Sequence, residues 1–164
     1  MSPEQALAEN NQSVEASSKT RLRLWLKILK TSKLIEAEIR DNLRTEFNST
    51  LPRFDVMAAL YQHQQGLKMS KLSGVLKVSN GNVTCIIDRL VSEKLVVRVP
   101  VEGDRRAMIV KLTNTGQQSF LAMAKVHESW IDSLLNSIDI DKADQLIGLL
   151  AGIEDNLDHG ETQS

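Results

Sequence analysis

The segment Ser79-Asn80-Gly81-Asn82-Val83-Thr84 carries side chains that suit contact with nucleic-acid bases. An asparagine amide can pair bidentately with adenine, and a threonine methyl can contact the methyl of thymine. Gly81 would let the backbone approach a phosphate closely, and the N-terminus of a helix favours an anion. Taken alone, the same residues also fit a plain turn. The elements around the segment decide between the two interpretations.

A second candidate for nucleic-acid contact is Asp104-Arg105-Arg106. Arginines at the tip of a hairpin suit a narrow minor groove, where the negative potential is enhanced. Asp104 could fix the direction of the Arg106 guanidinium by a charge-assisted hydrogen bond. In isolation, such a triplet is more often a solvated run of charges, so its position in the fold matters.

The residues before Ser79 predict a helix-turn-helix. Pro52 suits the first turn of a helix with apolar residues from Phe54 to Tyr61 and a stop at Gly66. After an extended piece over 67–69, Ser70 caps a brief helix. Residues 77–79 form a tight turn, and Ser79 caps a further helix with Val83, Ile87 and Leu90 facing inward. Two short helices joined by about three residues are typical of this motif.

A β-hairpin is predicted directly after the second helix. Residues 95–99 and 108–112 are β-branched runs, and residues 100–106 lie between them with the charged triplet at the tip. A helix-turn-helix followed by such a wing favours the DNA interpretation of both polar segments. The second helix would lie in the major groove, with Arg89 serving a phosphate.

Long helices flank this region. A pattern without Gly or Pro runs from Thr20 to about Glu46 and is apolar on more than one face, which indicates burial against a second subunit. Thr113 caps a helix to about residue 136, and Asp139 caps another to about residue 158 with a coiled-coil-like seam.

The predicted fold is mainly α with a small β-hairpin wing: a winged helix-turn-helix with long N- and C-terminal dimerisation helices. The predicted domains are a flexible N-terminal tail (1–19), a helical dimerisation region (20–48 and 114–158), a winged helix-turn-helix DNA-binding domain (49–113) and a flexible C-terminal tail (159–164).

Charge is unevenly distributed along the 164 residues. The net charge is −1, but residues 53–111 carry a net of +5 and residues 112–164 a net of −7. A basic middle indicates that one segment meets a polyanion. There is no apolar run long enough to cross a membrane and no secretory signal, and Cys85 is the only cysteine. We therefore expect a cytoplasmic protein without a membrane partner.

Residues 51–116 resemble the MarR family of bacterial regulators. The resemblance is carried by 69–73, 78–84, Ile87-Asp88-Arg89-Leu90, Leu95-Val96-Val97-Arg98, Asp104-Arg105-Arg106-Ala107 and 112–116. It implies a homodimer that binds a double-stranded DNA operator, most often as a repressor, and that is released by a small molecule. The predicted DNA-binding residues are Ser70, Ser79, Asn80, Gly81, Asn82, Thr84, Arg89, Asp104, Arg105 and Arg106.

The segments 21–26 and 51–55 further resemble family members that control the breakdown of aromatic acids. This resemblance implies a small aromatic effector, an acid such as a hydroxycinnamate or its coenzyme A thioester. An arginine could take the carboxylate or phosphate, and apolar side chains could line a slot for a ring. Each apolar residue could equally be part of the core. The predicted ligand-binding residues are Arg21, Arg23, Trp25, Leu29, Arg53, Phe54, Met57 and Met69.

Other functions have weaker signals. The chain lacks a phosphate-cradling glycine loop, a nucleophile elbow and an HExxH motif, so we expect no enzyme, cofactor or catalytic residue. Cys85 lies inside the presumed recognition helix, and the three histidines are scattered, which leaves redox or metal sensing as minor alternatives and predicts no metal site. A winged-helix module that binds a protein partner stays open as the main rival.

Overall fold

The computed structural model describes the backbone of residues 3–76, 80–101 and 104–160, with side chains over 17–76, 81–101 and 108–157. The chain divides into two compact units, Met1–Met123 and Ala124–Ser164. The described part is mainly helical with a small three-stranded antiparallel sheet, which confirms the predicted fold class.

The first helix, α1 (Pro3–Phe47), is longer than predicted. The part of the predicted N-terminal tail over 1–19 that the structure describes is helical from Pro3 onward. Proline suits the first helical turn, and the segment that follows has no glycine and several Ala, Glu and Gln, which are good helix formers. Among the described side chains of α1, those that join the core of the first unit are Ile39 and Leu43, near the end of the helix.

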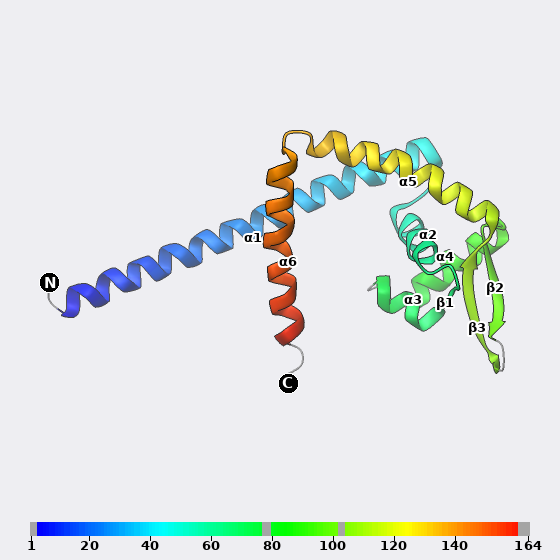
Figure 1. The fold of residues 1–164 in the computed structure, drawn as a ribbon, viewed down its shortest axis with the longest axis horizontal. Helices are drawn as coiled ribbons and strands as arrows, with labels where there is room; N and C mark the ends of the chain where they lie inside the picture. The colour runs from blue at the N-terminus through cyan, green and yellow to red at the C-terminus, as the bar shows by residue number, and fades with distance from the viewer. Residues whose placement is uncertain (1–2, 77–79, 102–103, 161–164) are drawn as a thin grey trace. The chain divides into compact units, whose positions relative to one another are not determined.

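The predicted helix-turn-helix lies in the first unit. It consists of α2 (Leu51–Gln62), the short strand β1 (Leu67–Lys68), α3 (Met69–Leu76) and α4 (Asn80–Ser92) (Figure 1). Thr50 caps α2 by accepting a hydrogen bond from the Arg53 N–H. The helix ends four residues before Gly66, which instead forms a turn at φ +93° ahead of β1. The core includes side chains with at most 1% exposure: Val56, Met57, Leu60, Leu72, Val83, Ile87 and Leu90.

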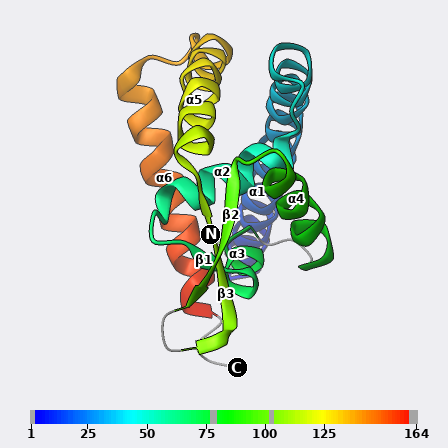
Figure 2. The ribbon, with the colours of Figure 1, turned by 90° about the vertical axis from the view of Figure 1, so that its right-hand side faces the viewer.

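The sheet has the order β1-β3-β2, with β2 (Val96–Val101) and β3 (Asp104–Leu112) forming the hairpin (Figure 2). Both hairpin strands are longer than predicted and extend into the expected loop over 100–106, of which residues 102–103 lie outside the described residues. A register shift between Pro100 and Val101 lets the edge strand accommodate a proline. The pairing of β1 with β3 was not predicted, because a two-residue strand carries no periodicity.

The helix α5 (Asn114–Leu135) begins where the sheet ends. The predicted cap is confirmed: Thr113 Oγ1 accepts from the Gly116 N–H at 3.0 Å and donates to the Lys94 carbonyl at 2.8 Å. Within the first unit, Phe120 of α5 stacks at a tilt on Phe54 and Tyr61, with ring centroids 5.5 and 5.0 Å apart. The start of α5 is therefore fixed to α2.

The second unit contains the remainder of α5 and α6 (Ile140–Gly160), joined by a turn. Asp139 caps α6 as predicted, with Oδ1 accepting from the Lys142 N–H at 2.9 Å. Because α6 continues to Gly160, the predicted tail over 159–164 is helical in its first two residues; residues 161–164 are not described. Across the described ranges, none of the helices combines the length and apolar character that a bilayer crossing needs.

Candidate nucleic-acid interface and a neighbouring charged cavity

The two faces of α4 differ sharply. Val83, Ile87 and Leu90 are fully buried, as their spacing predicts. The opposite face is exposed and carries Gly81, Asn82, Thr84 and Cys85 in the first half of the helix and Asp88 in the second. Small and polar side chains therefore occupy the face that a groove would meet, and a backbone without a Cβ lies at Gly81.

Other predicted DNA-binding residues stand at the ends of elements. Ser70 is exposed in the first turn of α3. The backbone of Asp104 to Arg106 opens β3 next to the hairpin tip, but the side chains of these three residues are not described. Ser79 lies outside the described residues, as does the side chain of Asn80.

An ion pair that the sequence analysis did not predict joins the wing to α4. Arg98 of β2 donates from Nη2 to Asp88 Oδ1 at 2.5 Å. The two residues lie ten positions apart, one on a helix and one on a strand, so no helical or strand spacing predicts the contact. It ties the strand that leads to the wing tip to the exposed face of α4.

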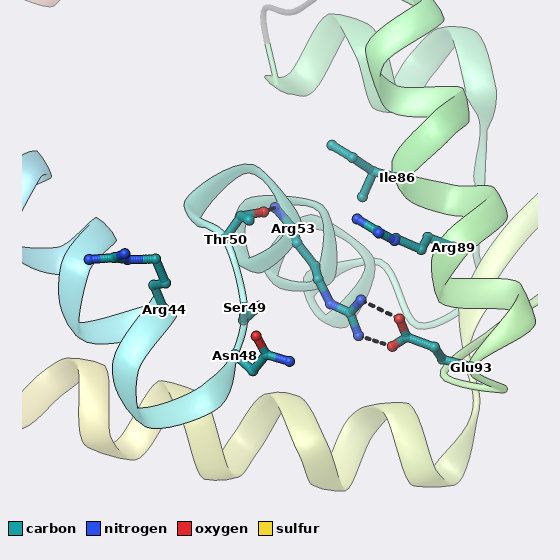
Figure 3. A pocket seen from close by; sticks show the side chains of 8 residues that line it. All are labelled: Arg44, Asn48, Ser49, Thr50, Arg53, Ile86, Arg89 and Glu93. Carbon is teal, nitrogen blue, oxygen red and sulfur yellow. Dashed lines mark hydrogen bonds and ion pairs between the residues drawn. The ribbon is translucent and has the colours of Figure 1, made fainter.

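A charged cavity of about 340 Å³ opens between the end of α1, the start of α2 and the second half of α4 (Figure 3). The α1 end contributes Arg44, and Arg53 comes from α2. The remaining lining residues come from the loop before α2 and from α4: Asn48, Ser49, Thr50, Ile86, Arg89 and Glu93.

Arg53 and Glu93 form a two-point ion pair at this cavity. Arg53 donates from Nη1 to Glu93 Oε1 at 2.7 Å and from Nη2 to Oε2. The hydrogen bond from Arg53 is the largest cause that lowers the pKa of the Glu93 carboxyl, and the charges of Arg53 and Arg89 add to it. Arg53, predicted to bind an effector, is thus held by Glu93.

Arg89 belongs to the cavity wall rather than to the first half of α4. Its guanidinium extends from α4 into the space between Ile86 and Arg53, whereas that of Arg44 is turned away from the Arg53–Glu93 pair (Figure 3). Arg44 and Glu93 were not predicted as site residues. The cavity brings Arg44 and Arg53 next to residues 89 and 93, and no local sequence pattern links α1, α2 and α4.

The predicted effector residues do not form one site in this chain. Arg21, Arg23 and Trp25 are exposed on α1, and Trp25 is 55% exposed. Phe54 and Met57 belong to the core instead, with exposures of 8% and 0%. The others are divided between elements: Leu29 lines a concave surface of α1, Arg53 lines the charged cavity, and Met69 starts α3.

The described residues offer little for redox or metal chemistry. Cys85 is exposed on α4. No cluster of three or more His, Cys, Asp or Glu suitable for a metal ion occurs in the part of the chain that the structure describes.

Both the sequence and the fold of this chain are similar to those of known proteins. Residues 49–108 match the model of the MarR family. The chain is 32% identical over 120 residues to the HTH-type transcriptional regulator YkoM of Bacillus subtilis (strain 168), an alignment that covers 72% of this chain and 76% of YkoM. It is similar to the crystal structure of a MarR family transcriptional regulator from Silicibacter pomeroyi, with a TM-score of 0.71, 31% identity, and coverage of 86% of this chain and 97% of that one.

The fold also matches that of a mutant MarR from E. coli complexed with operator DNA. The TM-score is 0.70 at 24% identity, and the match covers 82% of this chain and 95% of that one. Sequence and fold agree on one assignment, which is to transcriptional regulators rather than to enzymes: this chain belongs to the MarR family of winged helix-turn-helix transcriptional regulators.

Proposed function

We propose that the protein binds a double-stranded DNA operator through α4 and the β2–β3 wing. The observation that carries the proposal is the exposed face of α4, where Gly81, Asn82 and Thr84 lie on the side opposite the core. In this proposal the first half of α4 reads base edges in the major groove, and Arg105 and Arg106 reach the minor groove. The MarR structure with operator DNA supports the same use of the fold.

The proposed regulator is a homodimer. The apolar side chains of α6 are exposed in the single chain, among them Ile140 at 80%, Ile147 at 64%, Leu149 at 69% and Leu157 at 67%. Leu22, Leu24, Trp25 and Leu26 of α1 are each more than half exposed. Exposed apolar surface of this kind marks an interaction site. A second copy would bury it and present two α4 helices to a pseudo-palindrome, with half-sites about one helical turn apart.

We further propose that the protein is a repressor released by a small aromatic acid or its coenzyme A thioester. The support is the resemblance of residues 21–26 and 51–55 to regulators of aromatic-acid breakdown. An effector can release DNA only by binding better to a conformation in which the two α4 helices no longer match successive grooves. The coupling free energy expected for such a switch is about 1–3 kcal/mol.

Fluorescence anisotropy with a duplex from the gene's own upstream region tests this function. Wild-type protein should bind that duplex more tightly than a random duplex, with strong dependence on salt. Asn82→Ala should reduce the preference for the specific duplex more than it reduces non-specific affinity, because base contacts specify and phosphate contacts only position. Asn156→Ala, the same change at an exposed position of α6, is the matched control.

The wing is tested in the same assay. Arg106→Ala should weaken binding by about 1–3 kcal/mol and lower the salt dependence. Arg40→Ala, on the exposed face of α1, should change neither. If no aromatic acid or thioester releases the duplex, the proposal of a DNA-binding regulator stands and that of an aromatic effector is wrong. A folded protein without preference over random duplex would favour a protein-binding winged helix instead.

A further inference from the structure

The charged cavity beside α4 contains more positive than negative charge. Three arginines line it against one carboxylate, that of Glu93, which is already paired with Arg53. Arg44 has only a 3.4 Å contact with Asp41, and both side chains are about 70% exposed, so this pair contributes little. Among the residues whose side chains are described, none pairs with the guanidinium of Arg89. About two positive charges at the cavity are therefore poorly compensated.

A buried hydroxyl lies in the same wall. Ser49 is only 5% exposed, and its Oγ has no hydrogen-bond partner among the described residues. A buried polar atom without a partner is costly and rare, so it calls for an explanation such as a bound group. Ser49 also directly precedes Thr50, the N-cap of the 12-residue helix α2. The positive end of the α2 dipole adds to the field of the arginines.

We propose that this cavity binds the phosphate group of a small phosphorylated metabolite. A phosphate monoester carries about −1.5 to −2 charge at pH 7, which matches the excess of the wall. Guanidinium groups take phosphate oxygens bidentately, and Arg53 already shows this geometry toward a carboxylate. A volume of about 340 Å³ suits a small ligand. Ile86 is the one large apolar side chain of the lining, so the cavity offers an aromatic ring little contact.

Arg89 couples the binding of such a ligand to the binding of DNA. It belongs to α4, which under the proposed function reads the operator, and the regulatory consequence rests on that function. A phosphate group bound at Arg89 withdraws this cation from the DNA backbone and links α4 to the start of α2. The ligand site itself does not require DNA, so the two proposals can fail separately.

Isothermal titration calorimetry of the full chain in phosphate-free buffer, without DNA, tests the site. The probe is sn-glycerol 3-phosphate, and benzoate is the aromatic carboxylate for comparison. We expect saturable binding of the phosphate ester with one site per chain. Arg89→Gln should weaken it by about tenfold or more, as expected for loss of a charged hydrogen bond. Arg40→Gln removes the same charge from α1 outside the cavity and should leave the affinity within about twofold.

Two further variants separate ligand binding from a structural role. Glu93→Gln removes the competing carboxylate and should strengthen binding of the ester, which a purely structural ion pair would not do. Ser49→Ala should weaken binding without lowering the melting temperature, since the hydroxyl has no partner to lose.

Absence of glycerol 3-phosphate binding, or equal binding by wild type and Arg89→Gln, would overturn the proposal. Binding of benzoate alone at Arg89 would overturn it too, in favour of a carboxylate site. Loss of DNA affinity in Arg89→Gln, with no ester bound by the wild type, would make Arg89 a DNA contact and leave the proposed function intact. If the protein binds the ester but shows no preference for the specific duplex, the phosphate site stands and the proposed DNA-binding function is wrong.

Discussion

At the scale of single residues, Gly116 is the described glycine with the least room for a side chain. A Cβ added there would lie 1.9 Å from the Leu95 carbonyl oxygen, a backbone atom that cannot rotate away. Thr113 holds the same junction, because its N–H donates to the Leu95 carbonyl at 3.0 Å. The first turn of α5 therefore packs directly on the backbone that leads into the wing.

We predict that Gly116→Ala destabilises the protein by about 1–3 kcal/mol or more, because α5 or the start of β2 has to shift. The matched control is Gly74→Ala in α3, where nothing lies within 4 Å of the added methyl. That change should be neutral or stabilising by up to about 1 kcal/mol, from helix propensity. Urea unfolding followed by circular dichroism measures both. Equal stabilities of the two variants would contradict the close contact.

The Arg53–Glu93 pair predicts a pH dependence. The pKa of Glu93 is lowered from 4.5 in the folded protein, mainly by the hydrogen bond from Arg53. A lowered folded pKa contributes stability that is present above the unfolded pKa and is lost as the pH falls through the folded one. The wild type should therefore exceed Glu93→Gln in unfolding free energy at pH 7, and the difference should shrink below about pH 4.5.

Urea unfolding of both proteins at pH 7, 5 and 4 measures this difference. Glu154→Gln, at an exposed position of α6, controls for the general effect of losing a carboxylate. A gap between wild type and Glu93→Gln that stays constant with pH would show that ionisation of Glu93 is not linked to folding.

At the scale of elements, local chemistry specified most of the winged helix. The caps Thr113 and Asp139 and the inward face of α4 could be predicted, because each depends on residues within one or two turns. The charged cavity and the Asp88–Arg98 pair could not be predicted from the sequence, since each joins side chains from separate elements. The positions of the predicted effector residues depend on the fold in a similar way: Met57 and Trp25 are both apolar, but only the fold determines that one is in the core and the other exposed in the single chain.

We predict that the Asp88–Arg98 pair affects DNA binding more than stability. Its side chains are 56% and 37% exposed, so each of Asp88→Asn and Arg98→Gln should cost at most about 1 kcal/mol of unfolding free energy. Both changes free the wing from α4, so their effects on operator affinity should overlap rather than add. A double-mutant cycle in the anisotropy assay measures the coupling. Fully additive losses would mean that the two residues contact DNA independently.

At the scale of the whole molecule, charge and apolar surface are divided between regions of the chain. Residues 53–111 carry the net of +5, and residues 112–164 carry the net of −7 together with the exposed leucines of α6. The acidic C-terminal region would repel the phosphate backbone, which suits it to association with protein rather than with DNA. Under the proposed function, assembly and DNA contact use different surfaces, so a substitution in α6 can test one without touching the other.

We predict that replacing Leu146 and Leu150 of α6 together by glutamate converts the dimer into monomers. The two side chains lie four residues apart and are 46% and 43% exposed in the single chain, so a buried interface would have to take up two charges. Gln145→Glu, an exposed polar position of the same helix, controls for added negative charge.

Analytical ultracentrifugation gives the mass, and anisotropy gives operator affinity. A monomer should lose affinity for the full operator but retain weak, salt-sensitive binding to a half-site, because each subunit keeps its own α4 and wing. A double variant that stays dimeric would assign the interface to other surfaces, and a monomer with undiminished operator affinity would show that a single winged helix is enough to bind.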